Sequence, residues 1–456
     1  MRRPPTRKAL IVGALLIAAL AIRVAEVQGS SYRPVNDAGS YLTLASQIAH
    51  TGDYPTSAAR GKGAGGTRGP TAYFPPGYPY FLAATGLIDG HTTPRGGAIH
   101  SARLSQAVLG TVTVALIGLV ALEAFGETVA LIALGLAAVY PVLIALGGIL
   151  VAENLMTPLV LGASWAALRA GRSQRPYRWI AAAGVLTGLA TLVHVNAILV
   201  LIPLAVAAWR ARPALPAPAL VIVAALLTLA PWVVRNAIVM HRFVGISDET
   251  GITLEGTYNP ASASYGPVPY KWRLYYGIPA DHALIRQART LTEPQLSDRL
   301  QSRALDYISD HPLAPLAVTY YNTLRLLELE GSFAWQASAK AMGIPEQSAQ
   351  IGVISFWVLC ALALAGAVTR AARSAPRWLW AAPLLLWLSV AAINAETPRF
   401  REPVDVFLIL LAACALASVV AAGRSRLAGA PVGRQGRAAA IPARATELVQ
   451  IRERLA

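Results

Sequence analysis

The sequence predicts an all-α protein that crosses a membrane many times. Of its 456 residues, 55% are hydrophobic and only 14% are charged, whereas a soluble domain carries about 25% charged residues. The apolar residues form long runs, and a helix that spans a bilayer needs roughly 20 of them in succession. Ten runs reach or approach that length: 9–24, 104–122, 129–147, 155–168, 180–193, 197–209, 217–238, 351–368, 378–393 and 404–422. The fourth to sixth are short, so we expect them to tilt or break.

The basic residues predict how the ten spans are oriented. The net charge is +16, which in a soluble chain would suggest nucleic-acid binding. Here, however, Lys and Arg cluster before the first span, after the fourth, sixth and eighth spans, and in the tail. With ten spans these clusters share one face, and the positive-inside rule makes that face cytoplasmic. We therefore expect both termini in the cytoplasm, and the lipid bilayer rather than a nucleic acid as a partner.

Two long segments outside the membrane divide the chain. Residues 1–240 form a transmembrane module that contains the first outer segment, 26–102. The second outer segment, 241–349, is polar but rich in Tyr and Trp, as segments at a membrane interface are. It is followed by C-terminal transmembrane helices at 350–422 and a basic cytoplasmic tail at 423–456.

Both outer segments are expected to contain interfacial helices. Apolar residues recur at helical spacing from Ala38 to Ala49, which predicts an amphipathic helix on the membrane surface. A similar stripe of apolar residues occupies 296–308 and ends near His311. Between these helices, the glycine-rich stretch 60–69 is too rich in Gly for regular structure, and we expect it to be mobile.

The polar residues that could carry out chemistry lie at the outer ends of the spans. A charge at the bilayer centre costs about 2.5–3.5 kcal/mol, so charges near the spans are informative. Asp37 follows the first span and Glu153 opens the fourth. Comparable positions are held by His194, Asn196, Arg235, Asn236, Glu396, Arg399 and Arg401. Because distant segments bring these residues to one face, we expect a single site at the membrane surface.

Each of these residues also has a simpler structural explanation. Asp is a favoured N-cap residue, so Asp37 could cap a helix that begins at Ala38. Glu153 could be a structural partner of an arginine, and His194 could serve in packing alone, since no second ligand lies at metal-binding spacing. The arginines of 399–401 could extend to the headgroups, although their outer position runs against the charge bias. We predict no cofactor, and a divalent metal has no support in the sequence.

Several short motifs occur together in a fixed order. They are the Asp of the first outer segment, Tyr-Phe-Pro-Pro-Gly-Tyr-Pro at 73–79, Pro-Trp-Val-Val-Arg-Asn at 231–236 with Phe-Val-Gly-Ile-Ser at 243–247, Tyr-Ile-Ser-Asp-His-Pro at 307–312, and Arg-Phe-Arg-Glu-Pro at 399–403. Over most of the chain, this ordered set resembles the bacterial protein-mannosyltransferase and aminoarabinose-transferase-like branch of the GT-C glycosyltransferases. The resemblance implies a GT-C-like bundle of about ten transmembrane helices and an enzyme that uses a polyprenyl-phosphate-linked sugar donor.

The resemblance also implies roles for the candidate residues. Asp37 would be the catalytic base that removes the proton of an acceptor hydroxyl in an inverting transfer. Many relatives carry two adjacent acidic residues there, whereas Asp37 is flanked by Asn36 and Ala38, so we choose Glu153 as the second catalytic carboxylate. The donor phosphate would be held by paired hydrogen bonds from arginine, the candidates being Arg235, Arg399 and Arg401. The predicted substrate-binding residues are Tyr73, Tyr78, His194, Asn196, Asn236 and Glu396.

The sequence leaves the substrates open. A mannosyltransferase and an arabinosyltransferase would both meet a lipid phosphate and a sugar ring, and the acceptor could be a glycan, a glycolipid or a protein. We expect the bacterial inner membrane, with the active site facing the periplasm. The alternative is a lipid or glycolipid transporter or flippase. That alternative would favour charges deep along a path through the bilayer and an internal repeat, and neither is visible in the sequence.

Overall fold

The structure is a computed structural model that describes residues 6–54, 67–88, 96–395 and 397–428. Within this part of the chain the backbone is helical, without β-strands, and a single β-bridge joins Arg68 to Thr292. The chain comprises two compact units, residues 1–417 and 418–456. Of the second unit, the described residues 418–428 are helical. The predicted all-α membrane class is confirmed.

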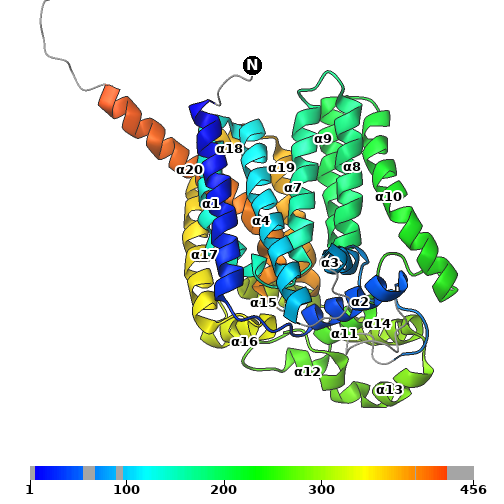
Figure 1. The fold of residues 1–456 in the computed structure, drawn as a ribbon. Coiled ribbons are helices and arrows are strands. Elements are labelled where there is room, and N and C mark those ends of the chain that lie inside the picture. The colour runs from blue at the N-terminus through cyan, green and yellow to red at the C-terminus, as the bar shows by residue number, and fades with distance from the viewer. Residues whose placement is uncertain (1–5, 55–66, 89–95, 396, 429–456) are drawn as a thin grey trace, which may run out of the picture. The chain divides into compact units, whose positions relative to one another are not determined.

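Long apolar helices build the first unit, and they run side by side in Figure 1. Their bounds are α1 (Arg7–Gly29), α4 (Gly96–Phe125), α5 (Glu127–Val139), α6 (Pro141–Gly147), α7 (Glu153–Ala170), α8 (Pro176–Val193), α9 (Leu201–Ala211), α10 (Pro216–Met240), α17 (Glu346–Ala367), α19 (Arg377–Ile393) and α20 (Glu402–Ala428), of which only the residues up to 417 belong to this unit. All ten apolar runs coincide with helices. Among the described residues, five helices are long and apolar enough to cross a membrane, and a bent pair would make six.

Two of the predicted spans are interrupted. α5 and α6 meet at an angle of 54°, because Pro141 has no N–H to continue the hydrogen bonds of α5 and its ring clashes with the preceding turn. α8 ends at His194, whose backbone is extended, and the 3-10 helix η3 (Val195–Val200) leads from there into α9. The sequence therefore identified the apolar segments correctly, and the short sixth span is broken as expected.

Small residues allow some of the helices to pack with their backbones in contact. A Cβ on Gly184 or Gly188 of α8 would overlap the Val221 carbonyl or the Thr228 side chain of α10. Likewise, a Cβ on Gly366 of α17 would overlap the Leu411 carbonyl of α20. In a membrane, helices associate through such close packing. The hydrophobic effect does not drive their association there, because lipid tails are as apolar as the helix surfaces.

The helices of the two outer segments gather at one end of the bundle, the lower end in Figure 1. They are α2 (Asp37–Thr51), α3 (Gly77–Ile88), α11 (Thr250–Thr257), α12 (Pro260–Ala263), α13 (His282–Gln287), α14 (Glu293–Asp310), α15 (Ala314–Leu326) and α16 (Ser332–Met342). The predicted stripes are the buried faces of α2 and α14. The stripe of α2 packs on α3 and the protein core, however. Of the glycine-rich stretch, residues 60–66 lie outside the described part.

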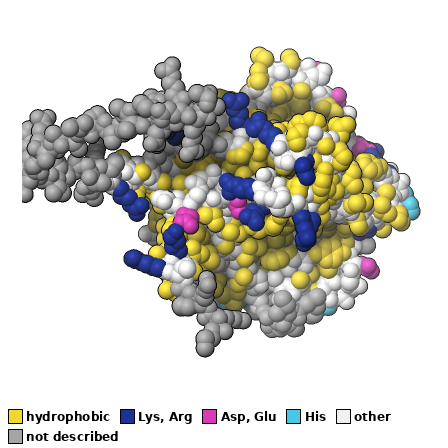
Figure 2. Space-filling view, turned by 90° about the horizontal axis from the view of Figure 1, so that it is seen from above, with side chains coloured by type: hydrophobic (Ala, Val, Ile, Leu, Met, Phe, Trp, Pro, Cys, Tyr) yellow, Lys and Arg dark blue, Asp and Glu magenta, His cyan; other side chains and the backbone are white. Residues whose placement is uncertain are grey.

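The other end of the bundle is basic. It carries the start of α1 and the connections α7–α8, α9–α10 and α17–α19, where arginines flank the helix ends. Figure 2 views this end and shows many Lys and Arg side chains on it, with few Asp and Glu. This is the charge pattern expected from the sequence. The assignment of this face to the cytoplasm stays a prediction.

Candidate active site around Asp37 and Arg399

Asp37 lies in the first turn of α2, with its carboxylate paired to an arginine. The N-cap residue of the helix is Asn36, whose φ is 49° and whose side-chain amide donates to the Ala341 carbonyl at 2.9 Å. The Asp37 carboxylate accepts a hydrogen bond from Nη2 of Arg399, which is distant in sequence. The simple explanation that Asp37 caps a helix beginning at Ala38 is therefore wrong.

Arg399 lies between two carboxylates. It belongs to the 3-10 helix η7 (Pro398–Arg401), which connects α19 to α20. Besides its bond to Asp37, its Nε lies 3.4 Å from Oε1 of Glu153, the first residue of α7. The side chain of Asp37 is 36% exposed, against 12% for Arg399 and 3% for Glu153. One carboxylate is thus accessible, while the other holds the guanidinium from the protein interior.

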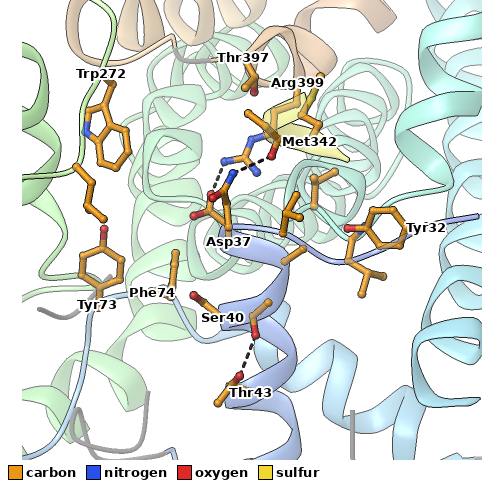
Figure 3. Close-up of a pocket in the computed structure, with 18 residues that line it drawn as sticks. Tyr32, Asp37, Ser40, Thr43, Tyr73, Phe74, Trp272, Met342, Thr397 and Arg399 are labelled. Carbon is orange, nitrogen blue, oxygen red and sulfur yellow. Dashed lines mark hydrogen bonds and ion pairs between the residues drawn. The ribbon is translucent and has the colours of Figure 1, made fainter. Parts of the chain in front are cut away.

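Asp37 and Arg399 face a pocket of about 380 Å³ (Figure 3). Its walls come from α2, from the chain near Tyr73, from Leu150 and Val151, from the segment containing Trp272, and from the end of α16. The volume lies within the range of about 300–1,000 Å³ that is usual for small-ligand sites. The pocket therefore offers an accessible carboxylate and a guanidinium side by side to a ligand of modest size.

The two predicted tyrosines have different surroundings. Tyr73 lines the pocket, as Figure 3 shows. Tyr78 is fully buried and packs edge-on against Tyr41, with ring centroids 4.9 Å apart. Its hydroxyl has no hydrogen-bond partner among the described residues. Tyr78 does not line the pocket, so it supports α2 from behind rather than facing a ligand there.

Arg401 does not face the pocket, although it follows Arg399 by only two residues. Its side chain is 1% exposed and lies 3.0 Å from Oε1 of Glu328 and 3.4 Å from Oδ1 of Asp405. It also donates to the Leu326 carbonyl at 2.6 Å and covers the ring of Phe356. These contacts occupy the guanidinium, so the predicted contact between Arg401 and a donor phosphate is not supported by its position.

Arg235 and Asn236 are also away from the pocket. Arg235 donates to the Thr71 carbonyl at 2.9 Å, and its guanidinium lies 4.8 Å from the ring centre of Trp232. Asn236 donates to the Gly245 carbonyl at 2.9 Å. The two residues therefore hold the segments that flank Tyr73 in place. Neither predicted ligand contact is supported, because both side chains are used within the fold.

His194 and Asn196 lie where α8 gives way to η3, behind η7. The His194 ring meets the Phe400 ring edge-on at 6.2 Å, and Asn196 donates to Ser389 at 3.2 Å. Neither residue lines the pocket. Glu396 lies outside the described residues. Among the residues that the structure does describe, no three His, Cys, Asp or Glu side chains are grouped so that they could hold a metal ion.

Two residues of the second outer segment belong to the neighbourhood of Asp37 and were missed from the sequence. Trp272 lines the pocket, and Glu249 lies just before α11. Burial and, next in size, the negative charge of Asp37 raise the pKa of Glu249 to about 8. Neither residue lies next to an apolar run, so the rule that found Asp37 and Glu153 could not find them.

Comparisons with known proteins agree with this architecture. Residues 74–234 match the family model of dolichyl-phosphate-mannose-protein mannosyltransferase. An apo oligosaccharyltransferase from Archaeoglobus fulgidus superposes with a TM-score of 0.53 at 14% identity, over 94% of this chain and 53% of that one. AglB of the same organism, in complex with an inhibitory peptide and a dolichol-phosphate, gives 0.51 at 14% identity, over 94% and 52%. The chain has the fold of a GT-C glycosyltransferase.

The GT-C resemblance predicted from the ordered motifs is thus confirmed. ArnT from Cupriavidus metallidurans, bound to undecaprenyl phosphate, also matches, with a TM-score of 0.41 at 15% identity over 91% of this chain and 79% of that one. No curated protein sequence matches the chain. This GT-C-fold chain spans about half the length of the archaeal structures that it matches.

Proposed function

We propose that this GT-C-fold protein is an integral-membrane glycosyltransferase that moves a sugar from a polyprenyl-phosphate donor to an acceptor hydroxyl. The observation that carries the proposal is the pairing of Asp37 with Arg399 at one pocket. The matched family is described by transfer of mannose from dolichyl phosphate, and the AglB structure contains a dolichol-phosphate. Both descriptions support a lipid phosphate as the donor class. These descriptions support the donor class by analogy with similar proteins, whereas the Asp37–Arg399 pair supports it from the site itself.

Asp37 is the base in this proposal. The acceptor oxygen forms a bond to the anomeric carbon, and its proton passes to the Asp37 carboxylate. At the same time the bond from the anomeric carbon to the phosphate oxygen breaks, and the polyprenyl phosphate leaves as an anion. Attack opposite the leaving group inverts the anomeric centre. A positioned base typically contributes about 10²–10⁴-fold to the rate.

Arg399 stabilises the phosphate that leaves. In the structure its guanidinium is shared by Asp37 and Glu153. We infer that the bound donor replaces Asp37 at Nη2, because charge-assisted bonds from arginine to phosphate are strong. Asp37 is then free to accept the proton, while Glu153 keeps the arginine oriented from the interior. Glu153 thus acts as a positioning residue, and this revises its predicted role as a second catalytic carboxylate.

A cavity of about 40 Å³ with mainly apolar walls lies beside Arg399, and we take it as the start of a route for the lipid chain. It shares Arg399 and Met342 with the pocket and is bordered by Val142 and Leu146 of α6 and by Gly352 of α17. The charged side chains of Glu328 and Arg401 also border it. An apolar channel beside a guanidinium matches a molecule that joins a hydrocarbon chain to an anionic head. We infer that the prenyl chain lies between α6 and α17 with its phosphate at Arg399.

We propose the bacterial inner membrane as the location, with both termini in the cytoplasm. The end of the bundle opposite the pocket carries the arginines, and the positive-inside rule puts such an end in the cytoplasm. The pocket would then open to the periplasm. Either mannose or an arabinose is the sugar, and a glycan, glycolipid or protein provides the acceptor hydroxyl.

The test is transfer of radiolabel from polyprenyl-phosphate mannose and polyprenyl-phosphate arabinose to an envelope fraction, with purified protein in liposomes. Label on a new acceptor supports an enzyme, whereas label that only crosses the bilayer supports a flippase. Asp37→Asn is expected to reduce transfer by about 10²–10⁴-fold while the protein stays folded. Asp53→Asn, which changes an exposed carboxylate just beyond α2, is the matched control and should transfer normally. Wild-type turnover by Asp37→Asn would refute the assignment of the base.

A further inference from the structure

Trp272 forms the wall of the pocket that faces Asp37. It comes from the chain between α12 and the 3-10 helix at Tyr275–Gly277, far in sequence from α2. Figure 3 shows the indole across the cavity from Asp37 and Arg399, with its nitrogen edge turned away from them and Tyr73 below it. The six-membered ring of the indole, rather than its N–H group, therefore lies on the side of the cavity.

The indole is held in place by α11. A Cβ on Gly256 would overlap Nε1 of Trp272 and would lie 2.5 Å from the Arg273 carbonyl oxygen. The backbone reinforces this contact, since the Arg273 amide donates to the Gly256 carbonyl at 2.9 Å. Nε1 of Trp272 has no hydrogen-bond partner among the described residues. Only glycine at position 256 leaves room for the indole, so the ring is positioned before any ligand arrives.

An aromatic ring and a charged pair that line one pocket match the two sides of a sugar. One side of a sugar ring presents C–H groups of slight positive charge, which the negative face of an aromatic ring attracts. The ring's hydroxyls point outward and need polar partners, and Asp37 and Arg399 offer them across the pocket. A lipid chain would use the apolar wall but not the ion pair.

We propose that Trp272, together with Tyr73, is the stacking wall of a carbohydrate subsite that presents a sugar ring to Asp37. The proposal rests on the proposed glycosyltransferase function for its choice of ligand class. It adds the position of the sugar ring and the residue that the sugar ring packs against. Gly256 is the positioning residue for Trp272. The wall belongs to the second outer segment, so this segment takes part in substrate binding.

Binding can be measured without any transfer reaction. The probes are methyl α-mannoside and methyl α-arabinofuranoside, observed by saturation-transfer difference NMR with the full chain in lipid nanodiscs. The wild type should transfer saturation to the ring protons of at least one probe, and Trp272→Ala should weaken binding roughly three- to tenfold. The matched control is Trp209→Ala, which removes an exposed indole from α9. Equal binding by wild type and Trp272→Ala, or no binding by the wild type, would overturn the proposal.

A double-mutant cycle tests the role of Gly256. Gly256→Ala should weaken sugar binding in the wild type, because the added methyl group displaces the indole. In the Trp272→Ala background the same change should have a much smaller effect on binding, since the indole is gone and only the close contact with the Arg273 carbonyl remains. Thermal unfolding checks that each variant is folded, and Trp272→Phe, which keeps a ring, should retain part of the binding. Full additivity of the two changes would contradict the proposed link.

Failure of this proposal and failure of the proposed function give different results. If the protein transfers label while Trp272→Ala leaves both probe binding and the KM values for donor and acceptor unchanged, the stacking wall is refuted and the enzyme stands. If no transfer occurs but probe binding depends on Trp272, the subsite stands and the transferase is refuted.

Discussion

Two arginines that are two residues apart lie in contrasting ion-pair clusters. Arg399 joins Asp37 and Glu153, and one of these carboxylates is 36% exposed in a pocket. Arg401 joins Glu328 and Asp405, whose side chains are at most 5% exposed. Each cluster contains one guanidinium and two carboxylates. They differ in access: Asp37 is exposed to the larger pocket, whereas the side chains of the Arg401 cluster are at most 5% exposed and border only the small cavity.

Because the two clusters contain the same types of residue, only their exposure indicates that the Arg399 cluster serves ligand binding and the Arg401 cluster serves stability. In the buried cluster every exchange of partner would leave a charge unpaired in the interior, which is strongly unfavourable. In the cluster at the pocket, an incoming phosphate can take the place of Asp37 at Arg399. The buried cluster also fixes η7 to α20 and to the end of α15, so it sets the position from which Arg399 reaches the pocket.

The largest expected effect comes from removing the accessible guanidinium. Arg399→Met should reduce kcat for sugar transfer by about 10²–10³-fold, since a preorganised donor that stabilises the developing charge is lost. The measurement is single-turnover transfer from a radiolabelled polyprenyl-phosphate sugar. The change also leaves the buried Glu153 carboxylate without its counter-charge, so thermal unfolding is measured alongside and kcat is taken per folded molecule. Near-normal kcat in folded Arg399→Met would remove the distinction between the two clusters.

Arg401→Met should act on stability first. It leaves the Glu328 and Asp405 carboxylates buried without a counter-charge, and breaking such a pair costs about 3–5 kcal/mol. Thermal unfolding in detergent measures the loss, and kcat per folded molecule should fall less than tenfold. The triple change Arg401→Met, Glu328→Gln and Asp405→Asn is the control, since it removes all three charges and should regain part of the stability. A stable Arg401→Met protein without transfer activity would reverse the interpretation.

The same comparison shows how far the sequence could lead. Apolar runs predicted the helices, and misplaced charges predicted Asp37, Glu153 and Arg399 as neighbours, because a charge near the bilayer is costly unless it is paired. The sequence could not distinguish Arg399 from Arg401. In a 3-10 helix of about three residues per turn, side chains two apart point in different directions, and only the packing of η7 decides which one faces the pocket.

Trp272 and Glu249 show a second limit. Both lie in the polar outer segment, where no periodicity relates them to the spans. Their place near Asp37 depends on tertiary contacts such as the bond from the Asp248 amide to the Ala72 carbonyl, at 2.9 Å. Such contacts join loops that the sequence pattern leaves independent of each other. The position of Arg235 away from the pocket has the same origin, since its partner Thr71 lies on one of these loops.

The apolar cavity beside Arg399 predicts an effect of intermediate size. Gly352 borders it, and a Cβ there would lie 3.6 Å from a methyl carbon of Val142, so Ala fits but a larger side chain fills the channel. Gly352→Leu should raise the KM for a long-chain polyprenyl donor by about tenfold, the equivalent of roughly 1.4 kcal/mol. A donor shortened to two prenyl units should be affected less, and Gly352→Ala is the control. An equal KM increase for both donors would argue against this lipid route.

The smallest effect is a pH dependence that belongs to the accessible cluster alone. Glu249 has a pKa of about 8, and the charged groups that act on it are Asp37, Arg399 and Glu153. Below about pH 8 it is neutral. Above about pH 8 it adds a negative charge near the pocket, which repels the donor phosphate, and an interaction of about 1 kcal/mol corresponds to roughly a fivefold change. The KM for the donor should therefore rise by about that factor between about pH 7 and about pH 9.

Glu249→Gln should remove this rise, because the amide stays neutral throughout the range. Glu255→Gln is the matched control: burial also raises the pKa of Glu255 to about 8, but its charged neighbours are Asp281 and Arg303 rather than Asp37. That variant should keep the wild-type pH profile of KM. Suppose instead that Glu255→Gln flattened the pH profile of the donor KM and Glu249→Gln did not. The titrating group would then lie outside the Asp37 pocket, and ligand access would no longer distinguish the Arg399 cluster from the Arg401 cluster.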